Sequence, residues 1–301
     1  MEKNEYESYI KAGRIAKEVK EFARNLIKPD MKLIDIASAI DSKIEELGGE
    51  PAFPVNLSIN EIAAHFTPAG GDESVAHGLL KIDLGVHVGG YIADTAFSMD
   101  LTEDGEFKEM IKLNDEILKR ITFGVVPRVE AKIVGEIAQD TLKEWNEKNK
   151  SRFSIIKSLS GHALGIDTIH AGLTISNYRN DNTAELDDMA FAIEPFVTTG
   201  VGDVYEGSPG GIYVLQRDDQ GRDKEARVVL NFIKENYKSR PFCIRWLEKK
   251  GFQKLRFVMA MLTKQGILYQ YPLLIEKSKA PVSQSENTFV VYDGAVVRTT
   301  E

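Results

Sequence analysis

Cysteine is almost absent from the 301-residue sequence, and this absence excludes two kinds of structure. Cys243 is the single cysteine, so neither an intramolecular disulfide nor a cluster of thiolate metal ligands can form within the chain. Any metal site must therefore use oxygen and nitrogen ligands. The lack of disulfides fits a reducing compartment, and we expect a cytoplasmic protein.

Long apolar runs and an excess of positive charge are also missing. No stretch reaches the roughly 18 apolar residues that suggest a membrane span, and charged residues follow Met1 where a signal peptide would have an apolar run. We therefore expect no membrane partner. Lys and Arg number 38 against 46 Asp and Glu, a formal net charge of −8. This balance argues against a dedicated nucleic-acid site, because phosphate binding depends on clustered Lys and Arg; local basic patches stay open.

The composition, 43% hydrophobic and 28% charged, is sufficient for a large core in one domain or in two unequal ones. Apolar residues recur at helical spacing in four segments, which predicts amphipathic helices over residues 5–26, 33–47, 106–123 and 130–145. Strand-like segments lie between and after these helices, so the pattern favours an α+β fold. Pro51 to Pro68 contains three prolines and predicts a short strand followed by an ordered loop.

A hairpin that carries two acids is predicted for the stretch LLKIDLGVHVGGYIADTAFSMDL. Gly89-Gly90 suits its two-residue turn, because glycine readily takes the positive φ that such a turn needs. Residue numbers that sum to 179 then face each other, so Asp83 lies opposite Ala96 and diagonally beside Asp94 on one face. Diagonal side chains are roughly 7 Å apart at the backbone, which leaves room for one or two cations. The alternative is one hydrogen-bonded acid at a strand end and one solvated acid, and the hairpin alone does not decide.

Two later strands are predicted to carry acids as well. MAFAIEPFV is an apolar strand broken at Glu194, and SQSENTFVVYDGAVVRTT predicts a hairpin that turns at Asp293-Gly294 with Glu286 at the start of its first strand. A buried acid in such a run needs a partner. The sequence thus predicts four acids on strands.

Three histidines lie in segments without helical periodicity. His162 and His170 occur eight positions apart in the glycine-rich SLSGHALGIDTIHAG, a spacing that matches neither a zinc finger nor HExxH. His65 lies in the loop predicted before Pro68. Read in isolation, each of the first two could be structural and His65 could be a solvated loop histidine.

Five segments, in this order, resemble the methionine aminopeptidases over nearly the whole chain: AFPVNLSINEIAAHFTP, KIDLGVHVGGYIADTAF, SGHALGIDTIHAG, AIEPF and QSENT. PFCIRWL and GILYQYP are similar to the helical insertion of the type II enzymes, which are archaeal and eukaryotic. The resemblance implies the α+β pita-bread (creatinase/aminopeptidase) fold, a curved antiparallel sheet that holds two divalent ions between pseudo-symmetric halves.

The same resemblance implies a division of the chain. Residues 1–204 and 272–301 would form the catalytic domain, and residues 205–271 an inserted winged-helix-like subdomain. KEARVVLNFIKENY, PFCIRWLEKK and KLRFVMAMLTKQG predict three helices in this insertion. Its basic residues alternate with acids, so we expect a solvated surface and no nucleic-acid site.

The resemblance also implies a two-metal site, with Asp83 on one ion, Asp94 and Glu286 bridging, and His162 and Glu194 on the other. A water shared by the ions would become a hydroxide near neutral pH and attack the first peptide bond. Glu194 would also relay the proton to the leaving amine. Cobalt, iron, manganese and zinc all accept these ligands, so the identity of the metal stays open.

His65 and His170 are expected to act in catalysis without binding metal, by holding the substrate backbone and stabilising the oxyanion. The resemblance points to Phe53, Ile169 and Tyr271 as walls of an apolar methionine pocket, although Phe53 and Ile169 could equally be plain core. The implied function is removal of the N-terminal methionine from nascent proteins when the second residue is small.

Three further expectations concern alternatives and partners. An Xaa-Pro-cleaving relative on the same fold usually carries an extra N-terminal domain, for which this chain has no room; a non-enzymatic, ribosome-associated scaffold would have lost ligands that are all present here. The expected partners are nascent N-termini, with transient ribosome contact left open, and we expect a monomer. Asn287 stands where the family commonly has histidine, and we expect adjusted hydrogen bonds there without loss of metal.

Overall fold

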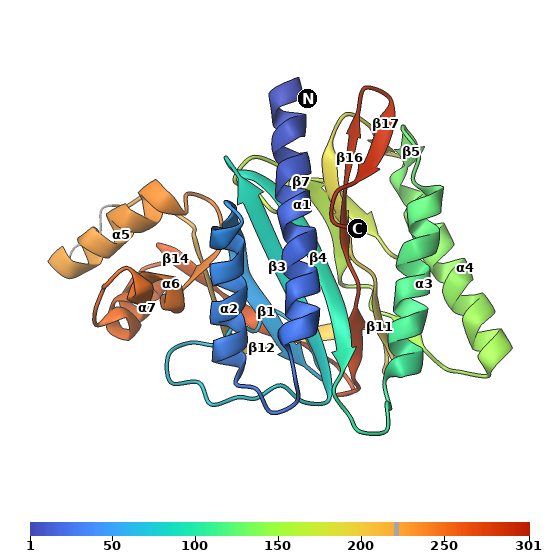
Figure 1. The fold of residues 1–301 in the computed structure, drawn as a ribbon, viewed down its shortest axis with the longest axis horizontal. Coiled ribbons are helices and arrows are strands. Elements are labelled where there is room, and N and C mark those ends of the chain that lie inside the picture. Colours follow the sequence, from blue (N-terminus) through green and yellow to red (C-terminus); the bar gives the residue numbers. More distant parts are fainter. Residues whose placement is uncertain (220–222) are drawn as a thin grey trace.

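The computed structural model, which describes residues 1–219 and 223–301, arranges helices along the outer faces of curved antiparallel sheets (Figure 1). The four predicted amphipathic helices and the three of the insertion are all confirmed, with small differences at their ends. The described helices are α1 (Lys3–Leu26), α2 (Leu33–Glu46), α3 (Lys108–Gly124), α4 (Ala131–Asn149), α5 (Lys224–Asn236), α6 (Ile244–Lys249) and α7 (Leu255–Lys264).

The described strands pair antiparallel in five sheets. Three of the sheets, in order of pairing, are β1 (Glu50–Ile59), β3 (Leu79–Val88), β4 (Tyr91–Asp100); β17 (Ala295–Arg298), β16 (Asn287–Tyr292), β10 (Ala190–Ile193), β7 (Ser160–Leu164), β8 (Thr174–Ser176); and β15 (Val282–Gln284), β11 (Phe196–Thr198), β6 (Ser154–Ile155). The other two are β13 (Phe242–Cys243), β12 (Val204–Leu215), β14 (Leu268–Glu276), β2 (Ile62–Ala64); and β5 (Val129–Glu130), β9 (Glu185–Leu186).

The hairpin of β3 and β4 has the predicted register. Asp83 pairs with Ala96, and Gly85 pairs with Asp94. The turn residues Gly89 and Gly90 have φ values of 60° and 92°, the left-handed region in which glycine has no steric penalty. The two acids are therefore diagonal neighbours on one face, as the sequence predicts.

The prediction for Pro51 to Pro68 was wrong in the length of its strand. β1 extends over ten residues through Pro51 and Pro54, with irregular register after Pro51 and again before Asn56. β1 lies at the edge of its sheet, where a missing N–H does not break a ladder on both sides, so both prolines are tolerated. The short β2 follows in place of part of the predicted loop.

Two site residues lie on different backbone than the sequence predicts. His162 lies within the strand β7, although its glycine-rich neighbourhood gave no strand signal. Glu286, predicted at the start of a strand, lies between β15 and β16, whereas Glu194 lies between β10 and β11, at the break that the sequence predicts. Pro195 cannot donate to a ladder, which explains the break at Glu194. Glu286 instead forms an isolated bridge with Ala96 of β4.

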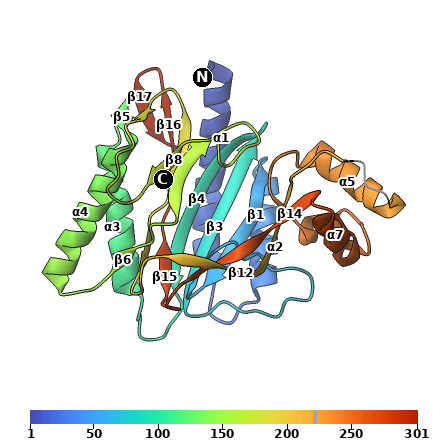
Figure 2. The ribbon, with the colours of Figure 1, turned by 180° about the vertical axis from the view of Figure 1, so that it is seen from behind.

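Two layers of helices cover the sheets, as Figure 2 shows from behind. Helices α1 and α2 pack on β3 and β4 through one buried apolar cluster, which includes Val19, Ile36 and Phe97. Helices α3 and α4 pack on β10 and β16 through another, which includes Ile117 and Phe289. The described helices include none with the length and apolar character that a membrane crossing requires.

The helices α5, α6 and α7 lie together beyond α2 (Figure 1). In the chain they come between β12 and β14, which pair with each other. They enclose a hydrophobic cluster of their own that includes Leu230, Phe242 and Met259. A buried ion pair joins this segment to α2: Arg245 Nη2 donates to Asp41 Oδ2 at 2.9 Å.

Gly13→Ala is expected to destabilise the fold, although alanine normally favours a helix interior by roughly 1 kcal/mol over glycine. A Cβ at Gly13 would lie 2.2 Å from Thr299 Cβ and 2.5 Å from Thr299 O, so α1 could no longer approach the C-terminal segment. We expect a loss of about 1–3 kcal/mol in the free energy of unfolding, as for other overpacked sites. Denaturant titration beside the exposed control Lys17→Ala measures it, and an equal or higher stability of Gly13→Ala would contradict the close approach.

Candidate metal and substrate site

A cavity of about 320 Å³ lies where the hairpin β3–β4 faces β7 and the segment before β16. Each residue that the sequence analysis assigned to catalysis, metal binding or substrate binding lines it: Phe53, His65, Asp83, Asp94, His162, Ile169, His170, Glu194, Tyr271 and Glu286. The structure thus brings together residues from both halves of the chain, and their individual roles stay predictions.

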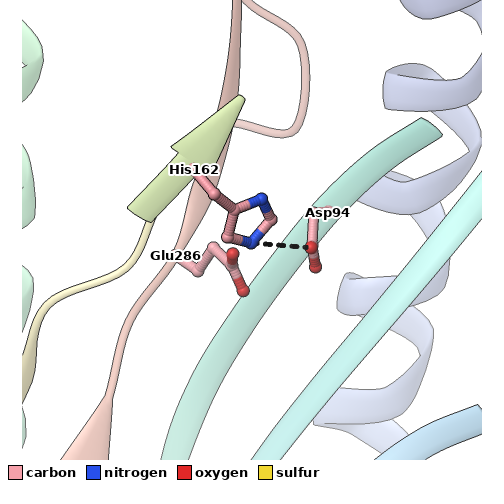
Figure 3. Close-up of side chains that lie close together, drawn as sticks. All are labelled: Asp94, His162 and Glu286. Atoms are coloured by element: carbon pink, nitrogen blue, oxygen red, sulfur yellow. Dashed lines mark ion pairs between the residues drawn. The ribbon is translucent and has the colours of Figure 1, made fainter. Parts of the chain in front are cut away.

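Three side chains converge most closely at the base of this cavity. Asp94 of β4, His162 of β7 and Glu286 each offer one atom, and these three atoms lie within 4.8 Å of one another (Figure 3). His162 Nε2 is 3.8 Å from Asp94 Oδ2 and 3.7 Å from Glu194 Oε1. This spacing could hold a metal ion with one nitrogen and several oxygen ligands.

Gln284 links the other two acids to this group. Its Nε2 donates to Asp83 Oδ2 at 3.3 Å and to Glu194 Oε2 at 3.4 Å. Gln284 is a site residue that no sequence pattern indicated, although it lies two positions before Glu286 in the same QSENT segment. Its amide thus contacts Asp83 of β3 and Glu194 of the break between β10 and β11 at the same time.

The four carboxyl groups are buried with like charges as neighbours. Burial raises the pKa of Asp83 to about 7, against the weaker opposing effect of the Gln284 hydrogen bond. Burial first, and then the neighbouring carboxylates, raise the pKa values of Asp94, Glu194 and Glu286 well above their usual range. Such a cluster cannot be fully ionised without cations to compensate it.

Several carboxylate oxygens are available for a ligand. Among the described residues, Oδ1 of Asp83, Oδ1 of Asp94 and both side-chain oxygens of Glu286 are buried without a hydrogen-bond partner. Buried polar atoms normally have a partner, so these four need one. Divalent ions that accept carboxylate and imidazole ligands fit this donor set.

The histidines around the acids are neutral. Burial, with a smaller contribution from His170, lowers the pKa of His162 to about 3 and that of His65 to about 4. His162 Nδ1 is 3.4 Å from the carbonyl oxygen of Ala163, which can only accept, so Nδ1 carries the proton and Nε2 keeps a lone pair. This is the form in which imidazole binds a metal.

His65 is not the solvated loop histidine of the alternative interpretation. It is only partly exposed and has a φ of 72°. Its backbone N–H donates to Asn56 Oδ1 at 2.7 Å. Its Nδ1 is 3.2 Å from the carbonyl oxygen of Pro272, so in the neutral ring Nε2 is an acceptor. A non-glycine residue at positive φ, held by surrounding contacts, is common at functional sites.

Apolar and aromatic side chains form the rest of the lining. Phe53 is 7% exposed, and its ring occupies the space where a Cβ of Gly85 would lie, 2.2 Å from Phe53 Cε1. The Tyr271 ring is 5.3 Å from that of His65, centroid to centroid. A slot with apolar walls beside a polar cluster suits a substrate with one apolar side chain.

Asn287 lies outside the residues that line the cavity and faces α1 instead. Its Oδ1 accepts from Lys20 Nζ at 3.2 Å and from Thr300 Oγ1 at 3.1 Å. Lys20 also donates to Thr95 Oγ1, and burial lowers its pKa to about 8. The partners of Asn287 thus include Lys20, which no local sequence pattern distinguishes from the other lysines of the helix.

Comparison with known proteins agrees with this geometry. The model of metallopeptidase family M24 matches residues 7–231. The methionine aminopeptidase of Pyrococcus horikoshii is 43% identical over 97% of this chain and 98% of its own length, and that of Thermococcus kodakarensis is 42% identical over 98% and 100%.

Solved structures show the same fold at low identity. A thermophilic Arx1 superposes with a TM-score of 0.78 at 16% identity, over 99% of this chain and 91% of that one. The methionine aminopeptidase of Thermotoga maritima gives 0.69 at 18% over 100% and 98%, and the prolidase of Pyrococcus furiosus 0.58 at 19% over 100% and 64%. The pita-bread fold is thus confirmed, and by sequence the chain belongs to metallopeptidase family M24, among its archaeal-type methionine aminopeptidases.

Proposed function

We propose that this chain removes the N-terminal methionine from nascent polypeptides whose second residue is small, by metal-dependent hydrolysis. The observation that carries the proposal is that a cluster of buried acids and a set of apolar walls lie in the same cavity. Buried carboxylate oxygens that lack partners among the described residues form its base, and apolar walls from Phe53, Ile169 and Tyr271 form its side. Relatives at 43% and 42% identity that bear the name methionine aminopeptidase support it.

The donor set suits two divalent ions. Asp83 would bind one ion, His162 and Glu194 the other, and Asp94 and Glu286 both; burial and the unused oxygens of these residues support the assignment. When bound, such a pair supplies a water of lowered pKa and a Lewis acid for the peptide carbonyl. Iron, cobalt, manganese and zinc all fit these ligands.

The protein's own residues bind the substrate and move the proton. Glu194, whose pKa burial raises, takes up a proton and delivers it to the leaving amino group. His65 accepts the substrate amide N–H at Nε2, because Nδ1 donates to Pro272 O. His170, whose ring centroid is 4.2 Å from that of His162, stabilises the oxyanion.

Two further points concern the alternative activity and the division of the chain. Likeness to a prolidase is one of fold at 19% identity, so the Xaa-Pro activity is not adopted. We assign residues 205–271 to an inserted subdomain because α5, α6 and α7 pack around their own cluster. The monomeric state, cytoplasmic location and transient ribosome contact stay predictions.

Divalent metal is expected to stabilise the protein more at pH 8 than at pH 6. In the metal-free protein the raised pKa values make the folded state bind more protons than the unfolded state between about pH 4 and pH 7 or above, so its stability falls as pH rises. Metal replaces these protons and binds more tightly as they leave. The melting temperature with and without Mn²⁺ measures the gain at each pH, and equal gains would count against a carboxylate site.

The proposed specificity predicts a strong dependence on the second residue of the substrate. Peptides beginning Met-Gly, Met-Ala or Met-Ser should be cleaved at least about tenfold faster than Met-Leu or Met-Lys, because the cavity of about 320 Å³ has to close around the scissile bond. Methionine release across the series measures this. Equal rates, or preferential cleavage of Xaa-Pro dipeptides, would reject the proposed function.

His65→Ala is expected to keep the metal and the fold and to lose turnover. Loss of one group that contacts the reacting amide typically costs about 10²-fold in kcat, roughly 3 kcal/mol. His77→Ala is the matched control, because His77 is an exposed loop histidine outside the cavity lining.

Three measurements decide the role of His65: metal content, melting temperature and kcat/KM. His170→Ala should behave like His65→Ala, and the double variant should lose less than the product of the two if both act on one group. Unchanged turnover in His65→Ala, or a loss explained wholly by missing metal, would remove His65 from the mechanism.

A further inference from the structure

Asp167 joins three segments that are distant in the chain. It lies in the turn after β7, is 8% exposed and has a φ of 52°. Its N–H donates to the carbonyl oxygen of Gly90 at 2.8 Å, in the turn of the β3–β4 hairpin. Its carbonyl oxygen accepts from Ser239 Oγ at 2.6 Å, beyond the end of α5. The residue is thus held by backbone contacts on two sides.

The carboxylate of Asp167 forms ion pairs with two basic side chains of the inserted segment, Lys238 and Arg240. Oδ2 accepts from Lys238 Nζ at 2.6 Å, and Oδ1 accepts from the guanidinium of Arg240. Arg240 is 5% exposed and donates with Nη2 to the carbonyl oxygen of Asn236 at 2.7 Å. A buried ion pair of this kind is costly to break on one side, because the remaining charge has no partner.

Both ends of this ion pair are next to walls of the substrate cavity. Asp167 precedes Ile169 by two positions and His170 by three, and Arg240 directly precedes Pro241. Ile169, His170 and Pro241 all line the cavity. The distance between the wall on the β7–β8 loop and the wall on the inserted segment therefore depends on the pair.

We propose that Asp167 is a positioning residue that sets the width of the side-chain pocket through Arg240 and Lys238. It touches no reacting atom; it holds Ile169 and His170 against the inserted segment. The inference rests on the proposed methionine-removing function. It adds that selection of a long unbranched apolar side chain over a branched one depends on this ion pair.

A second buried ion pair provides the matched control. Asp41 and Arg245 also join the main body to the inserted segment, with a side-chain exposure of 8% and 10%. Arg245 further donates to the carbonyl oxygen of Pro68 at 2.7 Å. Neither Asp41 nor Arg245 is among the described residues that line the cavity. A change at Asp41 therefore weakens the docking of the inserted segment without acting on a residue of the cavity wall, which separates the two effects.

The test compares Asp167→Asn with Asp41→Asn in the metal-loaded, full-length chain. Asparagine keeps the size of Asp167, tolerates its positive φ and leaves its backbone hydrogen bonds in place, so only the charge changes. The peptides X-Gly-Ser, with X as methionine, norleucine or leucine, give kcat and KM for each variant. The melting temperature reports any loss of docking.

For Asp167→Asn we expect KM for the methionine peptide to rise about tenfold, with a smaller change in kcat. The pocket wall at Ile169 controls how well the methionine side chain of the bound substrate fits, which affects binding more than the chemical step. The preference for methionine over leucine should narrow by a similar factor. Asp41→Asn should lower the melting temperature at least as much and leave KM and the preference within about twofold. In the double variant Asp167→Ala/Arg240→Ala, the change in KM should be smaller than the sum of the two single changes in free energy, because both substitutions remove the same contact.

Hydrogen exchange of residues 165–172 without substrate gives a readout that does not depend on catalysis. Asp167→Asn should speed exchange there, and Asp41→Asn should not. Unchanged KM and preference in Asp167→Asn, an equal change in Asp41→Asn, or unchanged exchange in the loop would overturn the positioning role. A wild-type protein that released no methionine from any peptide would instead reject the proposed function, and the exchange experiment would still decide whether Asp167 holds the loop.

Discussion

The burial of four carboxyl groups in one place is the constraint on which the rest of the structure depends. Asp83 and Asp94 come from one hairpin, while Glu194 and Glu286 come from two breaks in the opposite strands. Burial raises the pKa of each, so the apolar layers on both sides must hold together a centre that opposes folding. The two helix layers pack against the outer faces of the sheets that carry these acids. A cation in the cavity is the natural partner of the cluster.

Local patterns predicted much of this centre, and the exceptions have physical reasons. Helical periodicity and the Gly89-Gly90 turn depend on neighbouring residues, so the helices and the register of Asp83 and Asp94 could be read directly. The length of β1 could not, because its prolines are acceptable only on a sheet edge, which is a tertiary property. The strand character of His162 came from its pairing with β10. The methionine aminopeptidase resemblance supplied the assignments that periodicity could not.

The inserted segment is more than a cover over the cavity. Its cluster of apolar residues would hold α5, α6 and α7 together, but two buried ion pairs, one at Asp41 and one at Asp167, orient it on the main body. The partners in the second pair are 73 positions apart. Asp167 lies in the segment SGHALGIDTIHAG, but nothing in that segment indicates a contact with Arg240. Charge pairs of this kind specify one relative orientation, whereas apolar contacts alone tolerate several.

The packing of α1 has a consequence for synthesis of the chain. Gly13 fits against Thr299, and Lys20 Nζ donates to the carbonyl oxygen of Thr300 at 2.7 Å, a contact across 280 positions. A helix made at the beginning of translation therefore completes its packing only after residue 300 has left the ribosome. The apolar face of α1 can pack on β3 and β4 before that point, whereas Gly13 and the contacts of Lys20 with Asn287 and Thr300 reach their final partners last.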